Sequence, residues 1–143
     1  MKAVFINGFG GPEALTYGDR PEPEVASGEV MLRVRASALN HLDLNLRAGG
    51  SYKGPLPRIL GCDVAGEVAA VSPNAQTSLK VGDRVILDNR VKCGHCENCR
   101  LGLDQYCPTQ QRIGVDIDGG HAEYVTAPAG NAHKIPDSMS FTE

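Results

Sequence analysis

Four of the five cysteines lie within one short window of the chain. Cys93, Cys96, Cys99 and Cys107 follow the spacing C-x2-C-x2-C-x7-C. Two residues between cysteines allow a tight turn to bring both sulfurs to one point, and four thiolates make the tetrahedral shell that zinc prefers. A shell filled by four protein ligands leaves no position for water or substrate. The pattern therefore predicts a structural zinc rather than a catalytic one.

Disulfides, an iron–sulfur cluster and buried thiols fit these cysteines less well than zinc does. Disulfide bonds would leave one of five cysteines unpaired, iron–sulfur clusters use four cysteines at other spacings, and buried structural thiols would not gather in so polar a segment. His95 is a possible competing ligand, but four thiolates already complete the shell. Arg90, Lys92 and Arg100 lie nearby in the sequence, and we expect them to offset the net charge of about −2 on a four-thiolate zinc site.

The elements that must hold this window are strands. Residues 29–38 alternate apolar and polar side chains, which is the period-2 pattern of a strand with one buried face. Residues 40–47 are expected to form a short helix or helical turn, and Gly66 is expected to mark a bulge or bend. Further strands are predicted at 1–6, 14–17, 64–71, 81–87 (turn, then strand), 121–127 and 132–135, with loops at 18–28 and 51–58.

These elements together predict a mainly β, barrel-like domain with few short helices and a protruding cysteine lobe at about 90–112. A length of 143 residues suits one domain. The net charge of −3 and the lack of a basic stripe argue against a nucleic-acid partner. No apolar run is long enough to cross a membrane, and the N-terminal apolar stretch is too short for a signal peptide. We therefore expect a cytoplasmic protein, whose thiols stay reduced.

A dinucleotide-binding unit is not expected in this chain. No strand is followed by G-x-G-x-x-G and a long helix, and the glycines at 8, 10 and 11 precede a proline instead. Any binding of NAD or NADP would therefore need residues beyond these.

Several motifs occur in an order that is similar to a known family. Together with the cysteine lobe, the chain resembles the N-terminal catalytic domain of the medium-chain dehydrogenase/reductase superfamily, which includes zinc-type alcohol dehydrogenases and quinone oxidoreductases. The resemblance implies a GroES-like β-barrel over 1–143, a Rossmann cofactor domain that this chain lacks, and dimers of the full-length protein. The chain is then either a domain excised from a longer enzyme or a naturally short protein. The motifs are Ala38-Leu39-Asn40-His41-Leu42-Asp43, Leu60-Gly61-Cys62-Asp63-Val64-Ala65-Gly66, Val81-Gly82-Asp83-Arg84-Val85 and Gly119-Gly120-His121-Ala122-Glu123-Tyr124.

The resemblance also implies a second, catalytic metal site, and this sequence departs from it. The usual cysteine ligand is Asn40, the usual His-Glu pair is Cys62-Asp63, and the usual hydroxyl that relays the alcohol proton is Leu42. An amide is a poor zinc ligand beside thiolate and imidazole. Either Cys62 and Asp63 hold a metal with help, or Cys62 is a small buried residue and Asp63 is a structural or substrate-facing carboxylate. The departures favour the quinone-oxidoreductase branch without catalytic zinc.

Further residues near this site follow from the same resemblance. His41 lies where the family contacts the cofactor, although it could equally cap or pack the short helix. Asp43 loses the histidine that it usually braces, and Asn89 either reaches a substrate carbonyl or faces solvent. His121 and His133 are expected to have surface or packing roles.

Two functions from different classes follow. The first is the substrate-binding half of an NAD(P)-dependent oxidoreductase that acts on a small alcohol, carbonyl or quinone, with Asn40, Cys62 and Asp63 as candidate catalytic residues. This enzyme is expected to be active only at full length. The alternative is a zinc-stabilised binding or structural module without chemistry. Cofactor binding separates the two.

Overall fold

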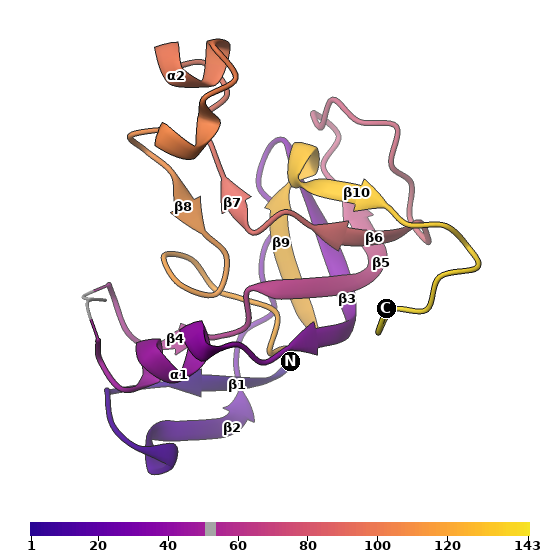
Figure 1. The fold of residues 1–143 in the computed structure, drawn as a ribbon. Coiled ribbons are helices and arrows are strands. Elements are labelled where there is room, and N and C mark those ends of the chain that lie inside the picture. Colours follow the sequence, from indigo (N-terminus) through magenta and orange to yellow (C-terminus); the bar gives the residue numbers. More distant parts are fainter. Residues whose placement is uncertain (51–53) are drawn as a thin grey trace.

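The computed structural model describes residues 1–50 and 54–143, and strands dominate it (Figure 1). A five-stranded antiparallel sheet has the order β10-β6-β5-β3-β9, and a smaller sheet has the order β2-β1-β4. The strands of the large sheet are β3 (Glu29–Ala38), β5 (Asp63–Val71), β6 (Arg84–Leu87), β9 (Tyr124–Pro128) and β10 (Ala132–Lys134). Those of the small sheet are β1 (Lys2–Ile6), β2 (Leu15–Asp19) and β4 (Arg58–Ile59).

Helices are few and short, as the sequence predicted. The α-helices are α1 (His41–Arg47) and α2 (Glu97–Arg100), and the 3-10 turns are η1 (Pro12–Ala14), η2 (Asp104–Tyr106) and η3 (Ala129–Asn131). Within the residues that the structure describes, no helix is long and apolar enough to span a lipid bilayer. The mainly β fold with a protruding cysteine lobe is therefore confirmed.

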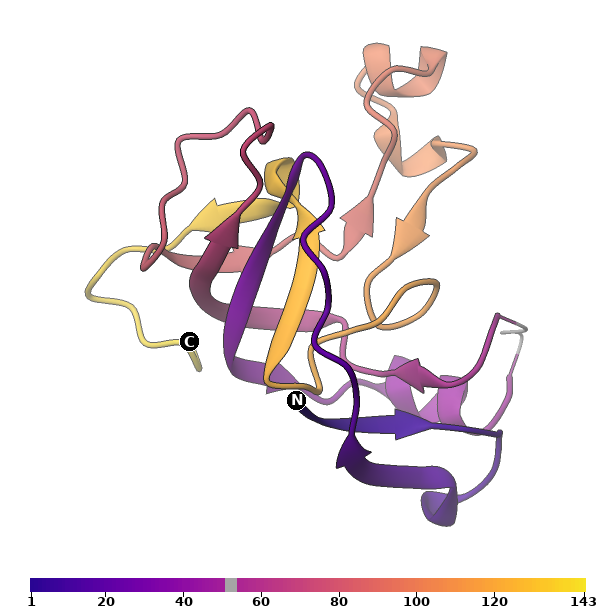
Figure 2. The same ribbon diagram turned by 180° about the vertical axis from the view of Figure 1, so that it is seen from behind.

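The large sheet, seen from behind in Figure 2, packs around the largest apolar cluster of the described residues. The alternation predicted for β3 is confirmed, because Val30 and Leu32 are fully buried while Arg33 and Arg35 are exposed. Burying side chains of this size is worth roughly 1.5–3 kcal/mol each. Their partners from other segments include Val68, Val85, Ile113 and Val125.

The predicted irregularity at Gly66 is present where β3 and β5 pair. The register between the two strands shifts between Val34 and Ala36, opposite this glycine. A Cβ atom at position 66 would lie 2.3 Å from the carbonyl oxygen of Arg33, so only glycine allows the backbones to approach this closely. The bend lets β5 start beside α1 and cross the large sheet.

Several predicted segment ends differ from the structure. Strand β2 continues to Asp19, into the predicted loop 18–28, and β10 ends at Lys134 rather than at residue 135. Residues 51–53 of the predicted loop 51–58 lie outside the described part of the chain. The last residue of that loop, Arg58, is the first residue of β4. Arg58 is buried rather than exposed and pairs with Asp118 at 3.0 Å. The predicted strand 121–127 begins only at Tyr124, because the chain before it packs tightly against the backbone at Gly61.

Candidate functional site

The cysteine lobe projects from the sheets on a two-stranded stalk. Strands β7 (Arg90–Val91) and β8 (Gln111–Arg112) pair antiparallel, and α2 and η2 lie at the far end (Figure 1). The large side chains at this end face solvent rather than a core: Leu101, Leu103 and Tyr106 are exposed by 66%, 43% and 67%. Apolar packing therefore contributes little to holding the lobe together.

The four predicted cysteines converge at one point of the lobe. Their sulfur atoms all lie within 4.8 Å of one another, and those of Cys93 and Cys99 are 4.0 Å apart. The sulfurs of Cys107 and Cys93 are 3.6 Å apart. A zinc tetrahedron with bonds of ~2.3 Å needs sulfur–sulfur distances of about 3.8 Å, so the donor set fits zinc. Across residues 1–50 and 54–143 this is the one group of three or more His, Cys, Asp or Glu side chains that could hold a metal ion.

Backbone amides rather than basic side chains face the sulfurs. The Cys96 N–H donates to the Cys93 sulfur at 3.4 Å, and the Cys93 N–H donates to the Cys107 sulfur at 3.5 Å. Backbone hydrogen bonds from His95 and then Cys96 lower the pKa of Cys93 to about 6. Desolvation and the neighbouring sulfurs raise the pKa of Cys99 to about 12. Such a mixture of thiolate and thiol is what a divalent cation would convert to four thiolates by displacing protons.

Two neighbours of the cysteines take different roles. Lys92, expected to offset the sulfur charge, forms ion pairs with Asp104 and with Asp88 instead. His95 hydrogen-bonds the Cys93 carbonyl through Nδ1 at 2.8 Å and stands outside the group of four sulfurs. No disulfide is present among the described residues, and all five cysteines are free.

The three candidate catalytic residues also lie together, at the junction of α1 and β5. Asn40 precedes α1, Cys62 ends the turn before β5, and Asp63 begins that strand. Asn40 donates from Nδ2 to the Asp63 carboxylate at 2.8 Å, and the same nitrogen lies 3.6 Å from the Cys62 sulfur. Cys62 is 5% exposed, whereas Asp63 faces solvent.

The Cys62 thiol is held in its protonated form. Desolvation raises its pKa most, and the carboxylates of Asp63 and Asp43 raise it further. A hydrogen bond with the Asn89 side chain acts in the opposite direction. Asn89, for which the sequence allowed either a substrate contact or solvent exposure, therefore contacts the buried thiol.

This second cluster does not fit a metal ion. An amide nitrogen with its hydrogens lies between the two groups that would have to coordinate, Cys62 and Asp63. A hydrogen-bond donor at that point repels a cation.

Asp43 joins the two segments that form the cluster. It is 5% exposed and accepts the Asn40 backbone N–H at 2.8 Å and the Gly61 backbone N–H at 3.0 Å. The first bond caps the N-terminus of α1 and the second fixes the turn that ends at Cys62. His41, the candidate cofactor contact, is exposed at the first residue of α1.

A histidine that the sequence assigned to a surface or packing role lies next to this carboxylate. His121 has a buried side chain, with Nε2 at 3.9 Å from Asp43 and Nδ1 at 3.0 Å from the Ser37 hydroxyl. Ser37 and His121 are 84 residues apart. No local pattern joins them, so only the fold could have brought this residue to the site.

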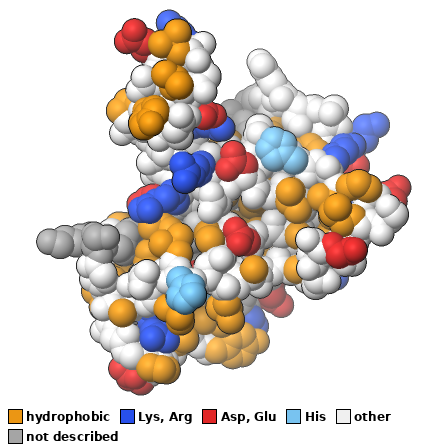
Figure 3. Space-filling model, in the orientation of Figure 1, with side chains coloured by type: hydrophobic (Ala, Val, Ile, Leu, Met, Phe, Trp, Pro, Cys, Tyr) orange, Lys and Arg blue, Asp and Glu red, His pale blue; other side chains and the backbone are white. Residues whose placement is uncertain are grey.

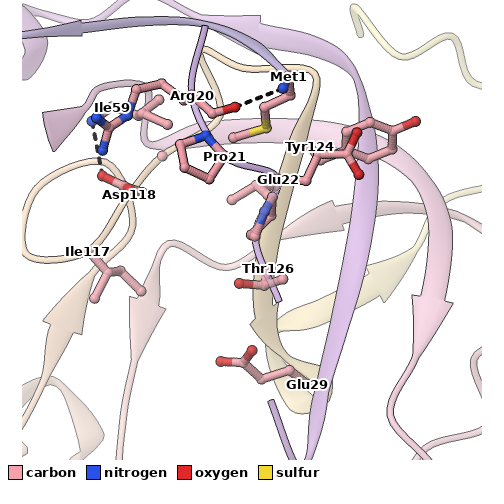
Figure 4. Close-up of a pocket in the computed structure, with 13 residues that line it drawn as sticks. Met1, Arg20, Pro21, Glu22, Glu29, Ile59, Ile117, Asp118, Tyr124 and Thr126 are labelled. Carbon is pink, nitrogen blue, oxygen red and sulfur yellow. Dashed lines mark hydrogen bonds between the residues drawn. The ribbon is translucent and has the colours of Figure 1, made fainter. Parts of the chain in front are cut away.

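Two of the hollows on the described surface differ in their relation to the candidate site. One, of about 520 Å³, is lined by Ser37, Asp63 and residues 141–143, so it lies beside the candidate site. The second, of about 350 Å³, is drawn in Figure 4. It contains none of the candidate catalytic residues. In it the Met1 amino group donates to the Arg20 carbonyl at 2.7 Å. We therefore regard the second hollow as a seam between the two sheets.

The chain matches one known family and several characterised proteins in sequence. The family model described as the alcohol dehydrogenase GroES-like domain matches residues 26–137. An alcohol dehydrogenase from Geobacillus stearothermophilus is 39% identical over 145 residues, which cover 100% of this chain and 42% of that protein. An L-threonine 3-dehydrogenase from Shewanella loihica is 33% identical over 90% of this chain and 38% of its own length.

Solved structures agree with this match. An NAD-dependent alcohol dehydrogenase superposes with a TM-score of 0.93 and 41% identity over 99% of this chain and 41% of that one. A cobalt- and zinc-bound thermostable alcohol dehydrogenase from Pyrobaculum aerophilum gives a TM-score of 0.88 and 37% identity over 94% of this chain and 40% of its own. The chain thus spans about two fifths of the proteins that it matches.

Proposed function

Because the chain belongs to the alcohol dehydrogenase GroES-like domain family, we propose that it is the substrate-binding and catalytic half of an NAD(P)-dependent oxidoreductase that carries one structural zinc. The resemblance seen in the motifs is confirmed by this match. The observation that supports the catalytic part best is the convergence of Asn40, Cys62 and Asp63 beside a hollow of about 520 Å³. Convergent polar groups with a perturbed thiol pKa are typical of a substrate site.

In this proposal residues 1–143 are one GroES-like domain, with the zinc lobe at about 90–112. The matched relatives are more than twice as long, and the proposal places the cofactor domain in a part of the protein outside these residues. The nicotinamide cofactor supplies or accepts the hydride when bound. His41 is proposed to contact that cofactor, because it is exposed at the first residue of α1, next to Asn40.

The zinc is proposed to be held by Cys93, Cys96, Cys99 and Cys107, the group that fits it. A closed shell of four thiolates leaves no place for substrate, so its role is to fix the lobe. Apparent zinc binding in small sites of this kind is worth ~10–16 kcal/mol at neutral pH, which is ample for a lobe whose apolar side chains face solvent.

The substrate site is proposed to work without a second zinc. The polar hydrogen-bond donors of this site are then the Asn40 amide and the Cys62 thiol, and in this structure both are directed at the Asp63 carboxylate. This set suits the reductase branch, in which a carbonyl, quinone or activated alkene accepts hydride while the protein orients it. A small alcohol is the substrate in the reverse direction.

Further properties belong to the same proposal. A full-length protein is expected to be a cytoplasmic homodimer that acts on small molecules, with no nucleic-acid or membrane partner.

Titration with NADPH tests the proposal. We expect no detectable binding to the 143-residue chain and saturable binding to a longer protein that includes the cofactor domain. No binding by the longer protein would favour the alternative, a zinc-stabilised module without chemistry. Elemental analysis of the same samples should give one zinc per chain, whereas two would indicate a zinc alcohol dehydrogenase.

A further inference from the structure

His121 is a buried histidine that the proposed reaction does not use. Its side chain is 10% exposed, and its Nε2 atom is buried without a hydrogen-bond partner. The nearest carboxylate oxygen, on Asp43, lies 3.9 Å from that nitrogen, too far for a hydrogen bond. Buried polar atoms are nearly always paired, so this nitrogen calls for an explanation.

The second ring nitrogen indicates where the proton lies. The Ser37 hydroxyl is 3.0 Å from Nδ1 and can donate to it. A neutral imidazole that accepts at Nδ1 carries its proton on Nε2. That proton then faces Asp43. The Ser37 O–H and the His121 Nε2–H therefore both point in the direction of the Asp43 carboxylate.

Close packing fixes the ring in this place. Gly61 has a φ angle of +94°, and a Cβ atom there would lie 2.6 Å from Nδ1 of His121. The His121 backbone N–H donates to the Leu60 carbonyl at 2.9 Å. The ring cannot move without moving the turn that leads to Cys62.

We propose that His121 is a positioning residue that acts through Asp43 to hold the Asn40 and Cys62 segments in register. The link is physical, because Asp43 accepts the backbone N–H groups of Asn40 and Gly61, one from each segment. Across the 3.9 Å between Nε2 and Asp43 the neutral ring attracts the carboxylate only weakly and leaves it with its two backbone amides, whereas a protonated ring would draw the carboxylate away from those amides. This role rests on the proposed function of the site that it orders.

The charged groups around the ring are few. Burial lowers the pKa of His121, and the Asp43 carboxylate from α1 opposes that effect. Glu123, two residues along the chain, is exposed and accepts the Lys2 backbone N–H at 2.7 Å. Ser37 from β3 is neutral. Asp43 is therefore the charged partner that a titration of this ring should report.

The experiment is an NMR titration of the zinc-loaded 143-residue chain from about pH 8 to about pH 4.5. We expect the imidazole midpoint of His121 to lie below about 6.5, the value for an unperturbed histidine. The backbone amide signals of Asn40 and Gly61 should shift with that same midpoint. In Asp43→Asn the His121 midpoint should fall further and the Asn40 signal should stop following it. His133→Gln, at an exposed position, is the matched control. It should change neither the midpoint of the His121 imidazole nor that of the Asn40 amide signal.

The proposal is overturned if the Asn40 amide does not follow His121 in the unaltered chain, a result that needs no variant to fold. An unchanged His121 midpoint in a folded Asp43→Asn chain would also overturn it. A ring that only fills space would shift Gly61, which it touches, but not Asn40. The titration uses neither cofactor nor substrate, so a negative result here is distinct from a failure of the NADPH titration.

Discussion

At the scale of single residues, an amide group lies in the candidate substrate site at the point where a metal ion would have to bind. Asn40 donates to Asp63 at 2.8 Å and lies 3.6 Å from the Cys62 sulfur, where ligands of a cation would have to converge. Two cysteines of the lobe differ from Cys62 in the direction in which their pKa is shifted. Backbone N–H groups lower the pKa of Cys93 and Cys107, whereas desolvation and two carboxylates raise that of Cys62.

Replacing one lobe cysteine tests this distinction. In Cys107→Ser we expect zinc content to fall far below one per chain, because a serine hydroxyl is a much weaker zinc donor than a thiolate. Cys62→Ser is the matched control, since it removes the remaining cysteine, and should leave zinc content unchanged. Elemental analysis of the purified variants measures both. Zinc loss in Cys62→Ser would contradict the assignment.

A second residue-scale prediction concerns pH and His121. Burial lowers the folded-state pKa of His121 below its unfolded value, so protonation favours unfolding. The stability that the neutral ring contributes is complete above about pH 6.5 and is lost as pH falls through the lower folded value. His121→Phe keeps the ring without the nitrogens, so its free energy of unfolding should fall less between about pH 7.5 and about pH 5. Urea denaturation at both pH values measures this, and equal losses in the two proteins would count against it.

The sequence could place some of these residues and not others. The spacing of the four cysteines from Cys93 to Cys107 predicts that their sulfur atoms converge on one site, because all four lie in one short window of the sequence. The grouping of Asn40, Cys62 and Asp63 came from the resemblance, and the structure brings the three together. The contact between His121 and Asp43 depends on strands that are distant in sequence, so no periodicity or motif could have indicated it.

At the scale of elements, β3 and β5 carry the site, and their pairing depends on one glycine. The alternation of β3 was predictable because one face is buried and the other is exposed. The two-residue strands β4, β7 and β8 were not, since such short strands carry no periodic signal. Strand β4 pairs with β1, and β7 and β8 pair with each other, so each depends on a partner from another part of the chain.

Substituting that glycine should weaken the sheet. In Gly66→Ala the new Cβ would lie 2.3 Å from the Arg33 carbonyl oxygen, so the backbone must shift. We expect a loss of about 1–3 kcal/mol in the free energy of unfolding, the usual cost of overpacking. Gly130→Ala is the control, because nothing lies within 4 Å of a Cβ at that position. Urea denaturation that finds equal stability for both variants would show that the close approach is unimportant.

Removing the metal should loosen the cysteine lobe and leave the large sheet unchanged. After chelation we expect the backbone amides of residues 93–107 to lose protection from hydrogen exchange, because the lobe has few buried apolar contacts. The amides of β3 and β5 should keep theirs, since the apolar core lies between them and the other long strands. Uniform loss across both regions would mean that the zinc holds the whole fold.

At the scale of the whole molecule, two parts with different sources of stability are joined by a narrow stalk. Figure 3 shows the lobe standing apart from the rest, with hydrophobic side chains on its surface. The sheets are held by buried Val, Leu and Ile, whereas the lobe is proposed to be held by a metal. The four sulfurs therefore lie in a part of the fold separate from α1 and the start of β5, where the candidate substrate site is (Figure 1).

We expect this chain to bind one zinc, and that zinc to lie among four sulfurs. Zinc K-edge X-ray absorption of the zinc-loaded chain tests it most directly, because the first shell reports the identity and distance of the ligand atoms. The account predicts four sulfurs at ~2.3 Å. A shell with nitrogen or oxygen atoms would contradict it, since the metal would then use His, Asp or an open site instead of Cys93, Cys96, Cys99 and Cys107.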